Sequence, residues 1–295
     1  MSTFLDSQTN PTFQKFFCKA EYEAYWACRH TCQNCVAEPT GTPTVPPTSA
    51  PTAPTVAPSL APTARTIQQV VLMGAPVSTL TAIQQAESPQ FQALQWMLLD
   101  EETISAWPDW RVQQLFAAAT LAFATNLGGG NGDRRWLNSY EECNFIGVTC
   151  DDSGVILQLD VTERNRGGEL PDEIAMFTSL TSFSGRRNRY TGPIPAAFGY
   201  LPSLETLILD QNSLTGNLPK SLENLSGSLI TLTVDRNELS GEFPSTVLSQ
   251  LTSLQIFSAF GNQFTGDIAE SICILPSLQS FVTDCENEGC YTQCI

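Results

Sequence analysis

Residues 204–219 read LETLILDQNSLTGNLP, and the same arrangement of apolar residues, asparagine and glycine returns in three neighbouring stretches. These stretches are LTSFSGRRNRYTGPIP (180–195), LITLTVDRNELSGEFP (229–244) and LQIFSAFGNQFTGDIA (254–269). The asparagines of the four stretches follow one another at intervals of 24 or 25 residues and are Asn188, Asn212, Asn237 and Asn262. A period of this length is typical of a solenoid, in which each coil is stable only against its neighbours.

Each recurrent position has a physical role. Leu207 and Leu209 alternate with outward-facing positions, which predicts one short strand per coil with one buried face. A buried asparagine has two donor hydrogens and one acceptor oxygen, so it can satisfy backbone groups of its own turn and of a neighbouring coil. We therefore expect the four asparagines to form a ladder. The glycine and proline that follow end the strand and turn the chain toward the outer side.

The complete pattern, L-x-x-L-x-L-x-x-N-x-L-x-G-x-I-P, resembles the plant-type leucine-rich repeat. Such repeats occur in receptor-kinase ectodomains, polygalacturonase-inhibiting proteins and secreted diatom proteins. The resemblance implies an α/β solenoid, that is, a leucine-rich repeat superhelix with a short parallel sheet on its concave face. Weaker frames at 156–171 and 278–286 extend the array; in the first, Arg164 takes the asparagine position and Arg166 a leucine position. Atypical end coils are expected of caps.

Changes in composition divide the chain into five parts. They are a cysteine-rich segment (1–38), a Pro/Thr-rich disordered linker (39–66), a helical N-terminal cap region (67–153), the repeats (154–272) and a last partial repeat with a cysteine-rich C-terminal cap (273–295). The linker contains too little apolar side chain to form a core, and it is either O-glycosylated or unmodified. In the cap region, Ser88-Pro89 predicts a helix start, and a second helix is expected over about 109–126. Four tryptophans, Trp96, Trp107, Trp110 and Trp136, are interpreted as core residues rather than a sugar-binding set.

The ten cysteines lie at the edges of these parts, which favours disulfides and an extracellular or cell-surface location. Residues 17–35 resemble the second half of a ShK-type toxin domain, which implies a Cys18–Cys32 pair; a zinc site there is disfavoured by the crowded spacing. Residues 136–151 resemble the N-terminal cap of plant-type repeats, which implies a Cys143–Cys150 disulfide. The pairing at the other end stays open among Cys273, Cys285, Cys290 and Cys294. Residues 1–10 show no secretory signal, so we expect an upstream start.

Charge and missing motifs exclude several functions. The formal net charge of −16 disfavours nucleic acid and anionic lipid as partners. Apolar runs are too short for membrane insertion by this chain. No hydrolase, metalloprotease or phosphate-loop motif is present, so we expect no enzyme activity, cofactor or metal. Asn224 begins an N-glycosylation sequon, Asn-Leu-Ser, expected on the outer side.

The strand positions that point away from the core should form a binding surface on the concave face. The candidate ligand-binding residues are Glu163, Arg186, Arg187, Asp210, Gln211, Asp235, Arg236 and Phe260. Arginine and phenylalanine are common interface anchors. We therefore expect an extracellular recognition module for a protein, peptide or glycan ligand. Two alternatives stay open, a structural or adhesive protein of a cell wall or matrix and an inhibitor of a secreted hydrolase.

Overall fold

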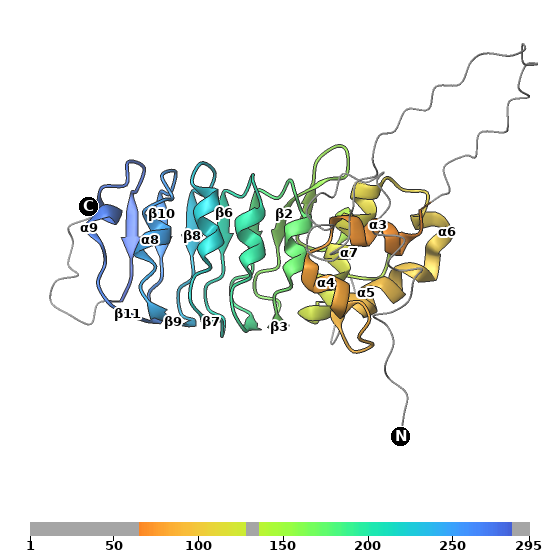
Figure 1. Ribbon diagram of the computed structural model, residues 1–295, viewed down its shortest axis with the longest axis horizontal. Coiled ribbons are helices and arrows are strands. Elements are labelled where there is room, and N and C mark those ends of the chain that lie inside the picture. The colour runs from red at the N-terminus through yellow and green to blue at the C-terminus, as the bar shows by residue number, and fades with distance from the viewer. Residues whose placement is uncertain (1–64, 128–135, 285–295) are drawn as a thin grey trace, which may run out of the picture. The chain divides into compact units, whose positions relative to one another are not determined.

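The computed structural model describes residues 65–127 and 136–284, which lie in one compact unit (Figure 1). The predictions for the cysteine-rich segment, for most of the linker and for Cys18, Cys32, Cys285, Cys290 and Cys294 fall outside these residues. No helix within 65–127 or 136–284 combines the length and the apolar character needed to cross a bilayer.

The main sheet contains one strand from each coil. Its parallel strands are β2 (Ile156–Asp160), β4 (Ser182–Ser184), β6 (Thr206–Ile208), β8 (Thr231–Thr233), β10 (Ile256–Ser258) and β12 (Ser280–Val282). Antiparallel β1 (Val148–Cys150) adds a seventh strand beside β2. The strand register aligns one inward apolar residue per coil in a single row, namely Leu159, Phe183, Leu207, Leu232, Phe257 and Phe281. The row is the stripe that holds the coils together.

The outer side of the solenoid consists of short strands followed by short helices. The strands are β3 (Gly167–Glu169), β5 (Arg189–Thr191), β7 (Thr215–Gly216), β9 (Glu238–Glu242) and β11 (Gln263–Thr265). The helices are η3 (Asp172–Met176), η4 (Ala196–Tyr200), η5 (Lys220–Leu225), α8 (Ser245–Leu248) and α9 (Glu270–Cys273). A proline stands at the N-cap of the first four, where its missing N–H is not needed: Pro171, Pro195, Pro219 and Pro244.

Helices cover the N-terminal end of the solenoid. They are α3 (Ile67–Gly74), α4 (Val77–Ala82), α5 (Pro89–Met97), η1 (Leu98–Asp100), α6 (Glu101–Ile104) and α7 (Asp109–Ala124). Ser88 caps α5 by accepting the N–H of Phe91 at 3.0 Å, as Ser88-Pro89 predicts. Helix α7 packs against α3, α5 and η3, and eight of its apolar side chains are buried, from Val112 to Ala122. It is the core of this helical layer.

Gln114 on α7 completes the hydrogen bonding of the first coil. Its Oε1 accepts from the backbone N–H of Ile156 on β2 at 2.7 Å, and its Nε2 donates to the carbonyl of Gly154 at 2.9 Å. The same nitrogen donates to buried Glu142, which also contacts Nε of Arg111 at 3.3 Å. Helix α7 thus supplies hydrogen-bond partners to the backbone of the first coil, whereas in the later coils the preceding coil supplies them. Cys143 and Cys150 form a disulfide beside this contact.

A second buried carboxylate joins the helical layer to the outer side of the first coil. Glu173 on η3 is fully buried and accepts hydrogen bonds from Thr79 on α4 and, at 3.0 Å, from Nε2 of Gln90 on α5. Burial raises the pKa of Glu173, although both hydrogen bonds oppose that rise. Each donor is neutral, so the carboxylate is compensated by hydrogen bonds alone.

Of the four tryptophans that were predicted to be core residues, Trp110 is the one for which the prediction is wrong. Trp136 is buried against Phe145, and its indole N–H donates to the carbonyl of Ile146 at 3.0 Å. Trp96 and Trp107 are half-buried, as the core interpretation requires. Trp110 is instead 40% exposed. Trp110 lies in the first turn of α7, before the buried residues of this helix begin at Val112. Its position on the helix therefore decides its exposure, although the side chain is hydrophobic.

Gly185 stands where the other coils have a larger buried residue, and Tyr190 fills the space. A Cβ atom on Gly185 would lie 2.9 Å from Cε2 of Tyr190 and 3.1 Å from the ring of Phe183. Tyr190 is fully buried, and burial raises the pKa of its phenol. The side chain that is missing at Gly185 and the large side chain of Tyr190 therefore compensate each other in volume.

Candidate ligand-binding face

The asparagine ladder fixes the spacing of the concave face. Nδ2 of Asn212 donates to the carbonyls of Leu209 in its own coil and Gly185 in the preceding coil, both at 3.0 Å. Oδ1 of Asn212 accepts from the backbone N–H of Tyr190 at 3.0 Å. Each of the other three asparagines makes the corresponding bonds to its own coil and to the preceding one. Asn188, Asn212 and Asn237 are buried, and Asn262 is half-buried.

Outward side chains form columns that cross the strands. The strand register places Asp160, Ser184, Ile208, Thr233, Ser258 and Val282 in one column. Two residues farther along each coil, the next column contains Thr162, Arg186, Asp210, Asp235, Phe260 and Asp284. The candidate residues Arg186, Asp210, Asp235 and Phe260 therefore come from four successive coils and share one column. Neighbouring strands of a sheet lie roughly 4.8 Å apart, so these side chains are within reach of one ligand.

The residue that precedes each ladder position has a left-handed backbone. The φ angles are 56° at Glu163, 54° at Arg187, 58° at Gln211 and 52° at Arg236. Gly261, with φ 75°, occupies the same position in the following coil. This turn lets the next side chain enter the coil as a ladder asparagine, or as Arg164 in the first frame. The pattern of apolar residues contains no signal for this strain, which non-glycine residues adopt only rarely.

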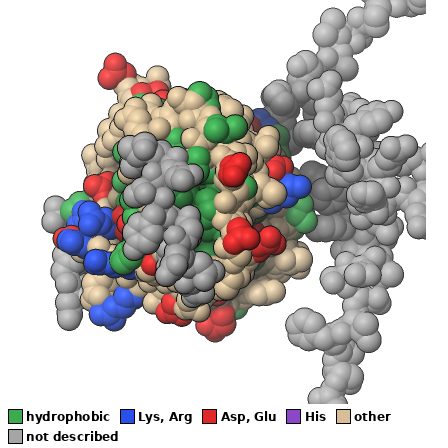
Figure 2. Space-filling view, turned by 90° about the vertical axis from the view of Figure 1, so that its left-hand side faces the viewer, with side chains coloured by type: hydrophobic (Ala, Val, Ile, Leu, Met, Phe, Trp, Pro, Cys, Tyr) green, Lys and Arg blue, Asp and Glu red, His purple; other side chains and the backbone are tan. Residues whose placement is uncertain are grey.

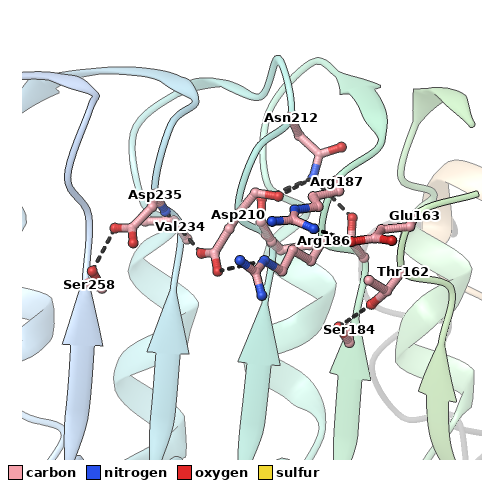
Figure 3. A network of polar contacts seen from close by, with 12 residues as sticks. Thr162, Glu163, Ser184, Arg186, Arg187, Asp210, Asn212, Val234, Asp235 and Ser258 are labelled. Atoms are coloured by element: carbon pink, nitrogen blue, oxygen red, sulfur yellow. Dashed lines mark hydrogen bonds and ion pairs between the residues drawn. The ribbon is translucent and has the colours of Figure 1, made fainter. Parts of the chain in front are cut away.

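The two adjacent arginines are held by carboxylates of the coils on either side. Arg187 forms an ion pair with Glu163 of the preceding coil, and Nε of Arg186 lies 3.9 Å from Oδ2 of Asp210 in the following coil (Figure 3). Both side chains are still about half exposed, at 43% for Arg186 and 49% for Arg187. The positive charges of Arg186 and Arg187 are therefore neutralised by carboxylates of the protein itself, and the two arginines do not form a free positive site.

Two aspartates hold the backbone of the following coil. Oδ1 of Asp210 accepts from the N–H of Asp235 at 3.1 Å, and Oδ1 of Asp235 accepts from the N–H of Phe260 at 2.8 Å. Asp235 also accepts from the hydroxyl of Ser258 at 2.6 Å (Figure 3). Burial raises the pKa of Asp210, while the backbone N–H and Arg186 lower it. These aspartates are structural groups of the face as well as candidate ligand contacts. Gln211 is half-buried and donates its backbone N–H to the carbonyl of Asp235 at 2.7 Å.

The C-terminal coils expose apolar side chains on the same face. Phe260 is 48% exposed, as expected for a contact residue, and it is accompanied by exposed Ile256 and Val282, which are not among the candidate residues predicted from the sequence. Each of the two follows the alternation of its strand, next to buried Phe257 or half-buried Phe281. Both residues could have been selected from the sequence, because each is an apolar residue at an outward position of a predicted strand. The concave face thus has ion-paired charges at its N-terminal coils, and exposed apolar side chains together with Asp284 at its C-terminal coils.

Asn224 lies away from this face, on η5 of the outer side, and is exposed. Its Nδ2 atom, the atom that would carry a glycan, donates to the carbonyl of Gly199 in the preceding coil at 3.3 Å. Cys273 at the end of α9 is disulfide-bonded. Stacked coils with a buried apolar stripe and an internal asparagine ladder define the described array as a leucine-rich repeat solenoid.

Comparisons with known proteins agree with this class. Residues 203–225 match the Leucine Rich Repeat family. Receptor-like kinase TMK2 of Arabidopsis thaliana is 36% identical over 86 residues, which are 29% of this chain and 10% of that protein. The LRR ectodomain of the plant membrane receptor kinase GASSHO1/SCHENGEN3 from Arabidopsis thaliana, solved in complex with CASPARIAN STRIP INTEGRITY FACTOR 2, has 30% identity and a TM-score of 0.53. That likeness covers 58% of this chain and 20% of that one.

A second solved structure, PEPR1-AtPEP1, has 27% identity and a TM-score of 0.51, covering 57% of this chain and 25% of that one. The repeats are therefore of the type found in plant receptor ectodomains. The chain spans about a tenth of the length of the curated relatives it matches.

Proposed function

We propose that this chain is an extracellular recognition module that binds an extended peptide or protein segment on the concave face. The observation that carries the proposal is the outward column of Arg186, Asp210, Asp235 and Phe260, which crosses four coils beside exposed Ile256 and Val282. Most of the basic side chains visible in Figure 2 gather at one edge of the molecule, whereas acidic ones are spread over the rest. A ligand that crosses the coils meets the ion-paired Arg186 and Arg187 first and the exposed apolar side chains of the last coils next.

The composition of the face favours a peptide over a glycan. Phe260 is the one aromatic ring among the candidate residues, whereas the neighbouring Ile256 and Val282 are aliphatic and offer no flat ring on which a sugar can stack, but they can cover an apolar side chain. The similar ectodomain of GASSHO1/SCHENGEN3 was solved in complex with CASPARIAN STRIP INTEGRITY FACTOR 2, and this supports a binding role for the repeat type. An extracellular location is consistent with the Cys143–Cys150 disulfide.

A variant that fills the face tests the proposal. Arg186→Glu with Arg187→Glu would also repel Glu163 and Asp210, so loss of binding would have two causes. Thr231→Trp is a cleaner change, because Thr231 is a half-buried outward residue on central strand β8. Thr246→Trp on α8 of the outer side adds the same side chain elsewhere.

The assay is selection of random twelve-residue peptides on the immobilised full chain, followed by affinity measurement for the enriched peptides. We expect Thr231→Trp to weaken binding at least about tenfold, corresponding to about 1.4 kcal/mol, and Thr246→Trp to leave it unchanged. Equal binding by both variants, or no enriched peptide, would refute a ligand-binding concave face and favour an adhesive role through the linker.

A further inference from the structure

The apolar side chains of the last coils form a continuous patch. Val282 pairs in register with Ser258, and Ile256 lies two residues before Ser258 on the same face of β10. Phe260 lies two residues after Ser258, so the three apolar side chains surround one small residue whose hydroxyl is bonded to Asp235. Their exposed fractions are 39% for Ile256, 48% for Phe260 and 43% for Val282. The patch is a shallow surface that can cover one bulky apolar side chain.

Arg236 adds a positive charge next to this patch. Its backbone N–H donates to the carbonyl of Phe260 at 2.6 Å, which ties the two coils together at this point. Its side-chain stem lies against Gly261, the residue after Phe260; a Cβ atom there would be only 3.2 Å from Cγ of Arg236. The start of the Arg236 side chain therefore lies against the coil that contains Phe260, next to the residue that follows Phe260.

The charge of Arg236 is not neutralised within 65–127 or 136–284. Arg187 is paired with Glu163, and Arg186 lies beside Asp210, whereas Arg236 forms no ion pair with any described residue. The nearest carboxylate along the chain, Asp235, is directed to the Ser258 hydroxyl and the Phe260 N–H. The formal net charge of the chain is −16, so an exposed arginine without an ion pair to any described residue stands out beside this apolar patch.

We infer that the peptide ligand presents a carboxylate to Arg236 and a neighbouring bulky apolar side chain to Ile256, Phe260 and Val282. The inference rests on the proposed function, because it specifies which part of the concave face selects the ligand. A guanidinium is well suited to a carboxylate because its parallel N–H groups match the two oxygens. The carboxylate is that of an Asp or Glu side chain, because a peptide that continues across the coils passes Arg236 with an internal residue; capture of a free C-terminus is the alternative that the test below excludes.

Two libraries of random twelve-residue peptides test the inference on the full chain. In one, each peptide is fused through its C-terminus, so that only side-chain carboxylates are available. In the other, each peptide ends in a free C-terminus. We expect enriched peptides to carry a carboxylate within two residues of Leu, Ile, Met or Phe. We expect enrichment in both libraries, whereas enrichment in the second library alone would show that a terminal carboxylate is bound and would overturn the inference.

Variants then separate the roles of the charge and the apolar patch. We expect Arg236→Gln and Phe260→Ala each to weaken binding of enriched peptides about tenfold, a loss typical of interface anchors. Arg189→Gln is the matched control, because Arg189 is an exposed arginine on β5 of the outer side. It should bind like the wild type.

The outcomes are distinguishable. If Thr231→Trp blocks binding but Arg236→Gln binds like the wild type, or if enriched peptides lack the carboxylate, the inference is wrong and the proposed function stands. If Thr231→Trp has no effect, or no peptide is enriched, both are wrong. Unchanged urea unfolding curves for Arg236→Gln and Phe260→Ala show that the losses arise from binding rather than from folding.

Discussion

The asparagine ladder leads to a quantitative prediction about coupling between coils. Asn212→Ala removes four hydrogen bonds of the side chain, yet each of the three carbonyls involved keeps another donor. Gly185 keeps the amide of Asn188, Leu209 keeps that of Asn237, and Asp210 keeps the backbone N–H of Arg187. Only the N–H of Tyr190 loses its acceptor. The expected loss is that of one buried donor, about 1–3 kcal/mol, rather than four times the value of a hydrogen bond.

The double variant Asn212→Ala with Asn237→Ala should be more destabilising than the sum of the two single changes. Both amides donate to the carbonyl of Leu209, so the double change also leaves that buried acceptor without a side-chain donor. We expect an excess of about 1–3 kcal/mol. Asn188 and Asn237 share no acceptor, so that pair should be additive within about 0.5 kcal/mol.

The measurement is urea unfolding of the full oxidised chain, followed by tryptophan fluorescence and far-ultraviolet circular dichroism. Free energies are compared only among variants with unchanged denaturant slopes and coincident transitions. Additive losses in the Asn212/Asn237 pair, or equal excess in both pairs, would refute the shared-acceptor argument. Neutral single variants would refute the buried ladder itself.

Three other changes test the packing of the solenoid. Leu209→Ala removes a fully buried side chain and should cost about 2–5 kcal/mol in urea unfolding, against a negligible loss for exposed Thr246→Ala. Gly185→Leu should destabilise by about 1–3 kcal/mol because of the contact with Tyr190, and adding Tyr190→Leu should recover most of that loss; a double variant no better than Gly185→Leu would contradict the volume exchange. Because burial raises the pKa of Glu173, the folded chain keeps this proton to higher pH than the unfolded chain, so stability falls as pH rises from the ordinary glutamate range through the raised pKa. Wild-type stability minus that of Glu173→Gln, measured from pH 4 to pH 8, should decrease across that window, and parallel profiles would contradict the assignment.

Much of the fold follows from local pattern. Leu207 and Leu209 are buried because alternation in a strand assigns them to one face, and this assignment needs no knowledge of distant residues. Ser88-Pro89 starts α5 through interactions within four residues. The parallel pairing of β4, β6, β8 and β10 follows from the repeat itself, since equal coil lengths place equal positions side by side.

The candidate face is less predictable, because it depends on what neighbouring side chains do to each other. Arg186 and Arg187 appear in the sequence as a free basic pair, but the stacking of coils brings Glu163 and Asp210 to them. Arg236 occupies the same position of its coil as Arg187, but it has no ion pair with any described residue. The left-handed backbone at Arg187 and Arg236 also comes from the turn that directs the ladder asparagine inward, for which these residues have no intrinsic preference.

By itself the sequence determined the solenoid, the buried stripe and the positions of the ladder asparagines. These features depend on periodicity, and periodicity is a property of residues close together along the chain or one repeat apart. The tertiary structure alone decided that Gln114 completes β2, that Glu173 is buried beneath α4 and α5, and that Arg236 lies beside an apolar patch without an ion pair to any described residue. The physical reason is that burial and charge pairing are set by which groups meet in space, and those groups come from different coils and helices.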